Sequence, residues 1–149
     1  MDQAFIRRRR LLLAAAAAWA GGHVGWAGAT GQHASALLAE FLEGQTATEQ
    51  GIELELPEVV DNATSVPVKI KVDWSADGTV FCEEVLVVAE ANPYPTVCRF
   101  RFTPLMGRTE VETRIRLSES QQVLVLARMS DGSMRQAQQD IMVVLGGCS

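Results

Sequence analysis

The sequence is poor in the side chains from which most active sites are built. It has two histidines and three cysteines, and His33 is the one histidine outside the first 29 residues. Catalytic triads need a base beside the nucleophile, and zinc sites usually draw on several histidines and cysteines. A Ser-His-Asp site, a Cys-His site and a metal site are therefore all hard to assemble from this chain.

Phosphate-binding motifs and excess positive charge are also missing. No glycine-rich loop follows a strand-like run and opens a helix, so nucleotide binding lacks its motif. The formal net charge is −5, and without residues 1–29 the chain keeps nine basic and seventeen acidic residues, a net charge of −8. Such an acidic body repels phosphate backbones, which argues against nucleic acid as a partner.

Long apolar runs are limited to the N-terminal region. The run from Leu11 to Ala20 has roughly half of the about 20 residues that a membrane-spanning helix needs, which disfavours a permanent membrane anchor. It follows the arginines at 7–10 and precedes Ala27-Gly28-Ala29, a pattern typical of signal-peptide cleavage. Paired arginines followed by leucines fit a twin-arginine signal. We therefore predict that residues 1–29 are a cleaved export signal and that the mature bacterial protein is periplasmic.

The rest of the chain alternates apolar and polar residues as β-strands do. A short amphipathic helix is expected at residues 35–43, and the period of two begins after Gly51. Turn-forming pairs such as Asp77-Gly78 and Asp131-Gly132 separate the strand-length runs. These runs cover residues 52–56, 66–72, 80–89, 97–102, 111–117, 123–129 and 141–145. The pattern predicts an all-β protein: one domain over residues 30–145, an immunoglobulin-like antiparallel β-sandwich of about seven strands with a short N-terminal helix.

Cys82 and Cys98 both fall in strand-like runs. In an oxidising compartment they could form a disulfide, although a hairpin centred on residues 92–95 would not place them directly opposite each other. The alternative is a pair of reduced, buried thiols that pack as small hydrophobic groups. The sequence leaves both interpretations open.

Cys148 stands apart, one residue from the C-terminus, in the tail Gly146-Gly147-Cys148-Ser149. Two glycines after a strand admit almost any backbone angle, so we expect a flexible tail that releases the thiol from the sandwich. Four extended residues reach up to about 13 Å, enough to enter a pocket of another protein. The thiolate is the nucleophile, so this tail predicts a group presented to partners. An intermolecular disulfide or a casual unpaired cysteine is the competing interpretation.

Several segments together resemble the SoxY family, the sulfur-carrying subunits of periplasmic thiosulfate-oxidising (Sox) systems. The likeness covers nearly the whole mature chain. It rests on the leader and on residues 52–58, 66–68, 89–95, 100–104, 111–117, 129–133 and 146–148. One departure concerns the tail, which in the family usually continues with glycines after the cysteine, whereas here Ser149 follows and the sequence stops.

The resemblance implies a cycle and a set of partners. A SoxZ-like β-sandwich subunit would form a heterodimer with this chain. A haem cytochrome of the SoxAX type would join thiosulfate oxidatively to Cys148, and a manganese hydrolase of the SoxB type would release sulfate. The carrier itself would bind no cofactor and would hold only the covalent thiosulfate-derived adduct.

Three functions are therefore weighed. The first is the covalent sulfur carrier, a non-enzyme that is the substrate of partner enzymes. The second is a non-catalytic periplasmic binding or assembly module whose tail cysteine forms an intermolecular disulfide. The third, a hydrolase in its own right, is disfavoured because a catalytic base is missing.

Overall fold

The computed structural model describes residues 29–144, with side chains from His33 onward. Its helices are α2 (Ala29–Leu42) and the 3-10 helix η1 (Pro104–Met106). Its strands are β1 (Ala47–Thr48), β2 (Ile52–Glu55), β3 (Val59–Val60), β4 (Val66–Val72), β5 (Cys82–Ala89), β6 (Thr96–Arg101), β7 (Thr109–Ile115), β8 (Gln121–Met129) and β9 (Met134–Val143). The expected export signal lies outside the described residues, apart from Ala29.

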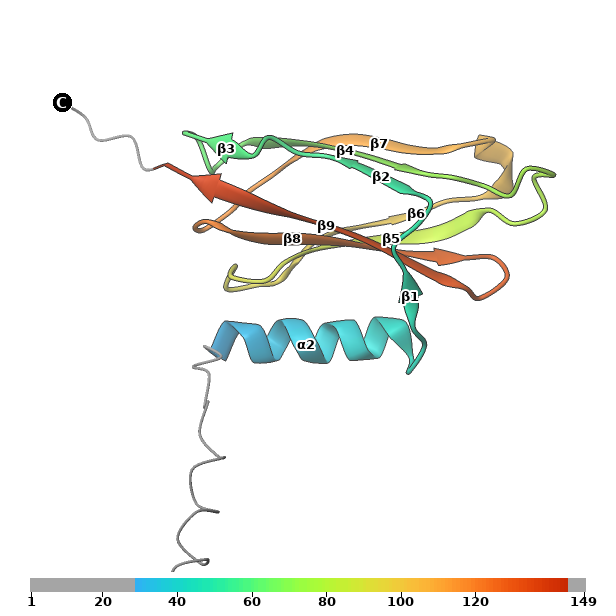
Figure 1. The fold of residues 1–149 in the computed structure, drawn as a ribbon, viewed down its shortest axis with the longest axis horizontal. Helices are drawn as coiled ribbons and strands as arrows, with labels where there is room; N and C mark the ends of the chain where they lie inside the picture. Colours follow the sequence, from blue (N-terminus) through green and yellow to red (C-terminus); the bar gives the residue numbers. More distant parts are fainter. Residues whose placement is uncertain (1–28, 145–149) are drawn as a thin grey trace, which may run out of the picture.

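Two sheets pack face to face, and α2 covers the outer face of the larger one (Figure 1). The larger sheet has the order β1-β9-β8-β5-β6, with β3 also beside β9, and the smaller sheet has the order β2-β4-β7. This arrangement confirms the predicted β-sandwich with one short helix. The seven strands of four or more residues pair antiparallel, whereas the two-residue strands β1 and β3 pair parallel with β9. Such short strands carry no periodicity, so the sequence analysis missed them.

The core between the sheets follows the predicted alternation. In β4, Val66, Val68, Ile70 and Val72 are buried, while the residues between them face outward. Each fully buried aliphatic side chain of this kind contributes about 1.5–3 kcal/mol to folding. The smaller sheet therefore presents one apolar face to the core and one charged face to solvent.

The central strands β5 and β8 of the larger sheet are instead buried on both faces. Val85 and Val87 of β5 face the smaller sheet, whereas Leu86 and Val88 pack with Phe41 of α2 in a second core. An alternation of polar and apolar residues is absent here because both faces exclude water. The helix begins at Ala29 rather than at residue 35. Ala34, which precedes the predicted start, is buried against the sheet, and packing of this kind contributes most of the stability of helices in proteins.

The last strand is longer than predicted. β9 begins at Met134, not at residue 141, because the hairpin at Asp131-Gly132 pairs it along its length with β8. Residues 135–140 are polar or small and show no apolar alternation. Backbone pairing to β8, rather than hydrophobic pattern, thus determines this part of the strand.

Gly51 occupies a tight corner between the two sheets. Its φ is +79°, and its carbonyl accepts hydrogen bonds from the Asp73 amide (2.9 Å) and from the Arg135 guanidinium (3.4 Å). The same guanidinium donates to the Asp73 carbonyl at 2.7 Å. A Cβ atom at position 51 would lie on this guanidinium, 2.9 Å from its Cζ. The positive φ therefore favours glycine at this corner, and a side chain there would also displace the end of Arg135 from its two hydrogen bonds.

We expect Gly51→Ala to lower the free energy of unfolding by about 2 kcal/mol or more, because it adds displacement of Arg135 to the cost of a left-handed alanine. Gly78→Ala is the matched control, since Gly78 also has a positive φ (+72°) but a Cβ atom added there would meet nothing within 4 Å. That variant should lose only about 1 kcal/mol. Urea denaturation measures both, and equal losses would contradict the role assigned to Arg135.

Candidate functional site

The carboxyl end of β9 is the last strand end before Cys148 in the described residues, and it is held from both sides. The Met142 amide donates to the Glu58 carbonyl and the Val144 amide to the Val60 carbonyl, each at 2.8 Å. On the other side the Val143 amide donates to Ser120 Oγ at 2.9 Å. The backbone is therefore anchored as far as Val144, beside β3 (Figure 1).

Cys148, Gly146, Gly147 and Ser149 lie outside the described residues. Four residue steps separate Val144 from Cys148, and covalent geometry limits the distance between their Cα atoms to about 14 Å. The thiol can therefore act only near this end of the sandwich. Apolar side chains are exposed there: Val59 (57%), Met142 (58%) and Val144 (46%).

The two other thiols are sheltered. Cys82 is fully buried in β5, with its Sγ 3.6 Å from the Glu84 carbonyl, and Cys98 is half-buried in β6. Burial raises the pKa of each thiol to about 11. Because the thiolate is the reactive species, both are poor nucleophiles at neutral pH.

The disulfide interpretation of Cys82 and Cys98 is wrong for this structure, and the reduced alternative holds. Cys98 lies opposite Val87, five positions along β5 from Cys82, or about 16 Å of strand at about 3.3 Å per residue. A disulfide needs Cα atoms within about 7 Å. Both cysteines are free thiols, and they fill the core as small hydrophobic groups.

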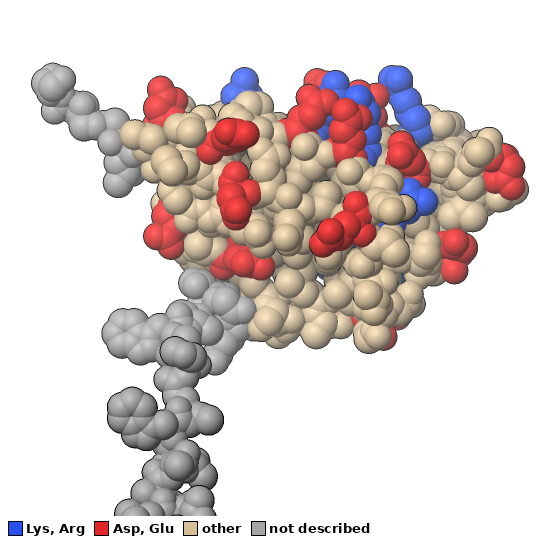
Figure 2. All heavy atoms as spheres, in the orientation of Figure 1, with Lys and Arg blue, Asp and Glu red and all other residues tan. Residues whose placement is uncertain are grey.

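The outer face of the smaller sheet carries the densest charge among the described residues. Lys69 Nζ lies 3.0 Å from Glu112 and 3.5 Å from Glu110, while Lys71 Nζ lies 3.1 Å from Glu53. Red and blue groups crowd together at the top of Figure 2, where the smaller sheet lies. The hydrogen bond and charge of Glu112 raise the pKa of Lys69, so this amine stays protonated.

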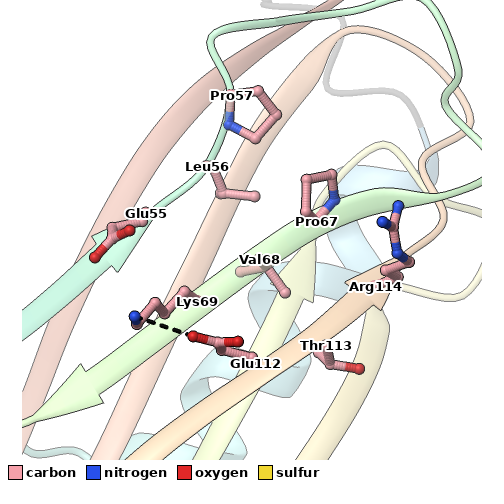
Figure 3. Close-up of a pocket in the computed structure, with 9 residues that line it drawn as sticks. All are labelled: Glu55, Leu56, Pro57, Pro67, Val68, Lys69, Glu112, Thr113 and Arg114. Atoms are coloured by element: carbon pink, nitrogen blue, oxygen red, sulfur yellow. Dashed lines mark ion pairs between the residues drawn. The ribbon is translucent and has the colours of Figure 1, made fainter.

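An open depression beside these charges marks the place where β2 separates from β4. Pairing ends at Glu55, and Leu56 and Pro57 turn away, leaving Pro67 exposed at the rim (Figure 3). The depression has a volume of about 710 Å³. Lys69, the lysine that lines it, is held in ion pairs with Glu110 and Glu112. The depression therefore presents paired surface charges and no free amine.

Within residues 33–144, no three His, Cys, Asp or Glu side chains come close enough together to hold a metal ion. His33, the one histidine of this range, is exposed on α2. In the same described part of the chain, no helix is long and apolar enough to cross a membrane.

Because Cys82 and Cys98 are buried, the free energy of unfolding depends on pH in the alkaline range. Unfolded thiols titrate near 9.0 and folded ones near 11, so the unfolded state loses protons first. The stabilisation is complete below pH 9 and is lost as the pH rises toward 11.

We expect the free energy of unfolding to fall between neutral pH and a pH of about 10.5, and Cys98→Ala to reduce that fall. Urea denaturation at the two pH values measures it. For the wild type and for each variant, the quantity compared is the difference between its own unfolding free energies at the two pH values. Each substitution also changes the packing, and this difference removes that contribution. If the fall in unfolding free energy were the same in the wild type, in Cys98→Ala and in Cys82→Ala, the pH dependence would not come from these thiols.

The geometry defines the class as a β-sandwich domain with a packed N-terminal helix and an anchored last strand that leads to the cysteine tail. The family model for sulfur oxidation protein SoxY matches residues 38–148. This chain belongs to the SoxY family, as the sequence resemblance indicated. Membership supports a carrier role in sulfur oxidation and partners from the Sox system, such as SoxZ.

Solved structures show the same fold. The sulfur carrier protein SoxY from Chlorobium limicola f thiosulfatophilum is 23% identical with a TM-score of 0.62, over 76% of this chain and 98% of that chain. A superoxide reductase (neelaredoxin) from Ignicoccus hospitalis is 18% identical with a TM-score of 0.53, covering 70% and 92%. A putative superoxide reductase from Thermotoga maritima is 18% identical with a TM-score of 0.51, covering 70% and 90%. No curated protein sequence matches the chain.

Proposed function

We propose that this chain is the covalent sulfur carrier of a periplasmic thiosulfate-oxidising system and that Cys148 is the attachment site. The observation that carries the proposal is the extent of the family match, which runs from residue 38 to Cys148 itself. The states of the other thiols support it, because Cys82 and Cys98 are sheltered and have raised pKa values.

Loading is an oxidation that needs an acceptor outside this chain. The Cys148 thiol and thiosulfate form an S–S bond, giving a cysteine S-thiosulfonate, one proton and two electrons. A haem cytochrome of the SoxAX type accepts the electrons. Hydrolysis by a manganese enzyme of the SoxB type then adds water across the terminal S–S bond, so that sulfate leaves and a persulfide stays on Cys148.

The carrier supplies position rather than chemistry. Hydrogen bonds hold the backbone through Val144, and the four residue steps that follow let the thiol reach about 14 Å from that point. The chain then acts as substrate of the partner enzymes and binds no cofactor of its own. A SoxZ-like subunit completes the heterodimer, and residues 1–29 direct export by the twin-arginine route.

We expect the mature protein, incubated with the SoxAX-type cytochrome and thiosulfate, to gain the mass of one thiosulfate less the thiol hydrogen. Intact-mass spectrometry with peptide mapping should place it on Cys148. Cys148→Ser should abolish the gain, whereas Cys98→Ser, which also removes one thiol, should leave it intact.

Loading found only at Cys82 or Cys98 would overturn the proposal. So would a Cys148→Ser variant that still supports thiosulfate oxidation in cells. That second result would favour the binding module, in which the tail cysteine serves an intermolecular disulfide.

A further inference from the structure

β7 forms one outer edge of the smaller sheet. It pairs with β4 along its whole length, from Thr109 opposite Val72 to Ile115 opposite Val66, without a register shift. Among the described residues, no strand pairs with its other side. A regular edge of this kind presents unpaired backbone N–H and C=O groups to other chains. β7 can therefore accept a further strand.

Two neighbours of β7 show which of its backbone groups face this open edge. Pro67 of β4 lies opposite Arg114 and has no N–H, so these two residues cannot exchange a pair of backbone hydrogen bonds. Just beyond β7, the side-chain amide of Asn92 donates to the Arg116 carbonyl at 2.9 Å from outside the smaller sheet. Because backbone groups alternate in direction along a strand, those of residues 110, 112 and 114 point outward as well. Asn92 also limits the open edge to the residues before Arg116.

The outer face of β7 and of the residue after it carries an ordered row of charges. Two acidic side chains come first and two basic ones follow: Glu110, Glu112, Arg114 and Arg116. Thr113 lies at the centre of this row, between Glu112 and Arg114 along the strand (Figure 3). The row therefore reverses its sign of charge about Thr113.

The central charges of the row are only partly satisfied within the chain. Glu112 pairs with Lys69 at 3.0 Å, yet its side chain stays 68% exposed, so a second donor can reach it. Arg114 donates to the carbonyl and the hydroxyl of Ser65, each at 3.3 Å. In the part of the chain that the structure describes, no carboxylate lies within ion-pair distance of Arg114 or Arg116. The basic end of the row is thus open to a carboxylate from another molecule.

We infer that β7 pairs antiparallel with the β7 of a second copy of this chain, about a twofold axis at Thr113. In this register Glu112 of each copy faces Arg114 of the other, and opposite charges placed directly across two strands stabilise the pair. On the inner face, Val111 of each copy lies opposite Ile115 of the other. The contact is the same on both copies, as a twofold interface requires.

Charge selects this register over its neighbours. An axis at Glu112 would set two glutamates against each other, and an axis at Arg114 would do the same with two arginines, and both arrangements are destabilising. An axis between two residues would bring the charged outer face of one copy level with the apolar inner face of the other. The axis at Thr113 also brings Glu110 toward Arg116, although Glu110 already contacts two basic side chains of its own chain.

The self-pairing goes beyond the carrier function and does not depend on it. It joins two three-stranded sheets into one continuous sheet. β2 and β7 are opposite edges of the smaller sheet, and the residue after β2, Leu56, adjoins β9 through the hydrogen bond from Gln139 to its carbonyl at 2.8 Å. The seam therefore lies on the edge of the smaller sheet that is opposite to β9.

The first test is disulfide cross-linking of the mature chain carrying Cys148→Ser, so that the tail thiol forms no intermolecular bond. One preparation also carries Glu112→Cys and a second carries Arg114→Cys. Facing Cα atoms in an antiparallel pair are about 4.5–5.5 Å apart, within the range of a disulfide, whereas positions offset by two residues are about 7–8 Å apart. Under mild oxidation, the mixture should form covalent dimers at least tenfold faster than either preparation alone.

Glu53→Cys mixed with Arg114→Cys is the matched control for random collision, since Glu53 is a carboxylate of similar exposure (61%) on the other edge strand of the same sheet. That mixture should cross-link no faster than the single preparations. A rate in the Glu112→Cys and Arg114→Cys mixture that only equals this control would overturn the self-pairing. Faster cross-linking of Glu112→Cys with itself would overturn the register.

The second test is sedimentation equilibrium of the Cys148→Ser chain, which measures the dimer without a covalent link. Arg114→Glu combined with Arg116→Glu should weaken dimerisation at least tenfold, because every facing pair then carries like charges. Arg114→Lys combined with Arg116→Lys keeps the charge and should bind far more tightly than the glutamate pair. Thermal unfolding of each variant confirms that it is folded, and Arg114→Glu alone replaces the pair if the pair is unstable. A Cys148→Ser chain that stays monomeric at millimolar concentration, or a glutamate pair that dimerises as well as its parent, would overturn the inference.

Discussion

Burial of the two central strands of the larger sheet, β5 and β8, on both of their faces is the constraint on which the rest of the structure depends. β5 and β8 supply apolar side chains to two cores. One set of side chains packs between the two sheets, and the alternate set packs in the core beneath α2. Phe41 anchors the helix: it is 3% exposed, and the guanidinium groups of Arg128 and Arg99 lie 5.0 and 5.8 Å from its ring centroid. Without α2, a face of Leu86, Val88, Leu124 and Leu126 would meet water, so helix and sheet stabilise each other.

Burial also lowers the reactivity of Cys82 and Cys98. A thiol inside the core is held in its protonated form because the surrounding apolar groups cannot solvate a thiolate. Cys82 and Cys98 are in this position, and their strand register also keeps them apart. For the carrier function proposed above, this arrangement means that neither thiol in the described residues competes strongly as a nucleophile.

The two edges of the larger sheet differ in how they are covered. At one edge, β9 is paired with β8 and flanked by β1 and β3, so its end is fixed in place. At the other edge, β6 is uncovered in the described structure and lies near arginines and exposed apolar groups.

The sequence by itself determined the sandwich class, the approximate positions of six of the seven longer strands and the singling out of Cys148. Period-two alternation in segments such as Val66–Val72 and the Asp-Gly turns are local signals, and Cys148 is conspicuous because so few other reactive side chains exist. The tertiary structure alone decided the parallel pairing of β1 and β3, the early start of β9 and the separation of Cys82 from Cys98. These depend on strand register and on contacts between residues far apart in the chain. Periodicity reports which way a side chain faces and carries no information about which strand lies beside it.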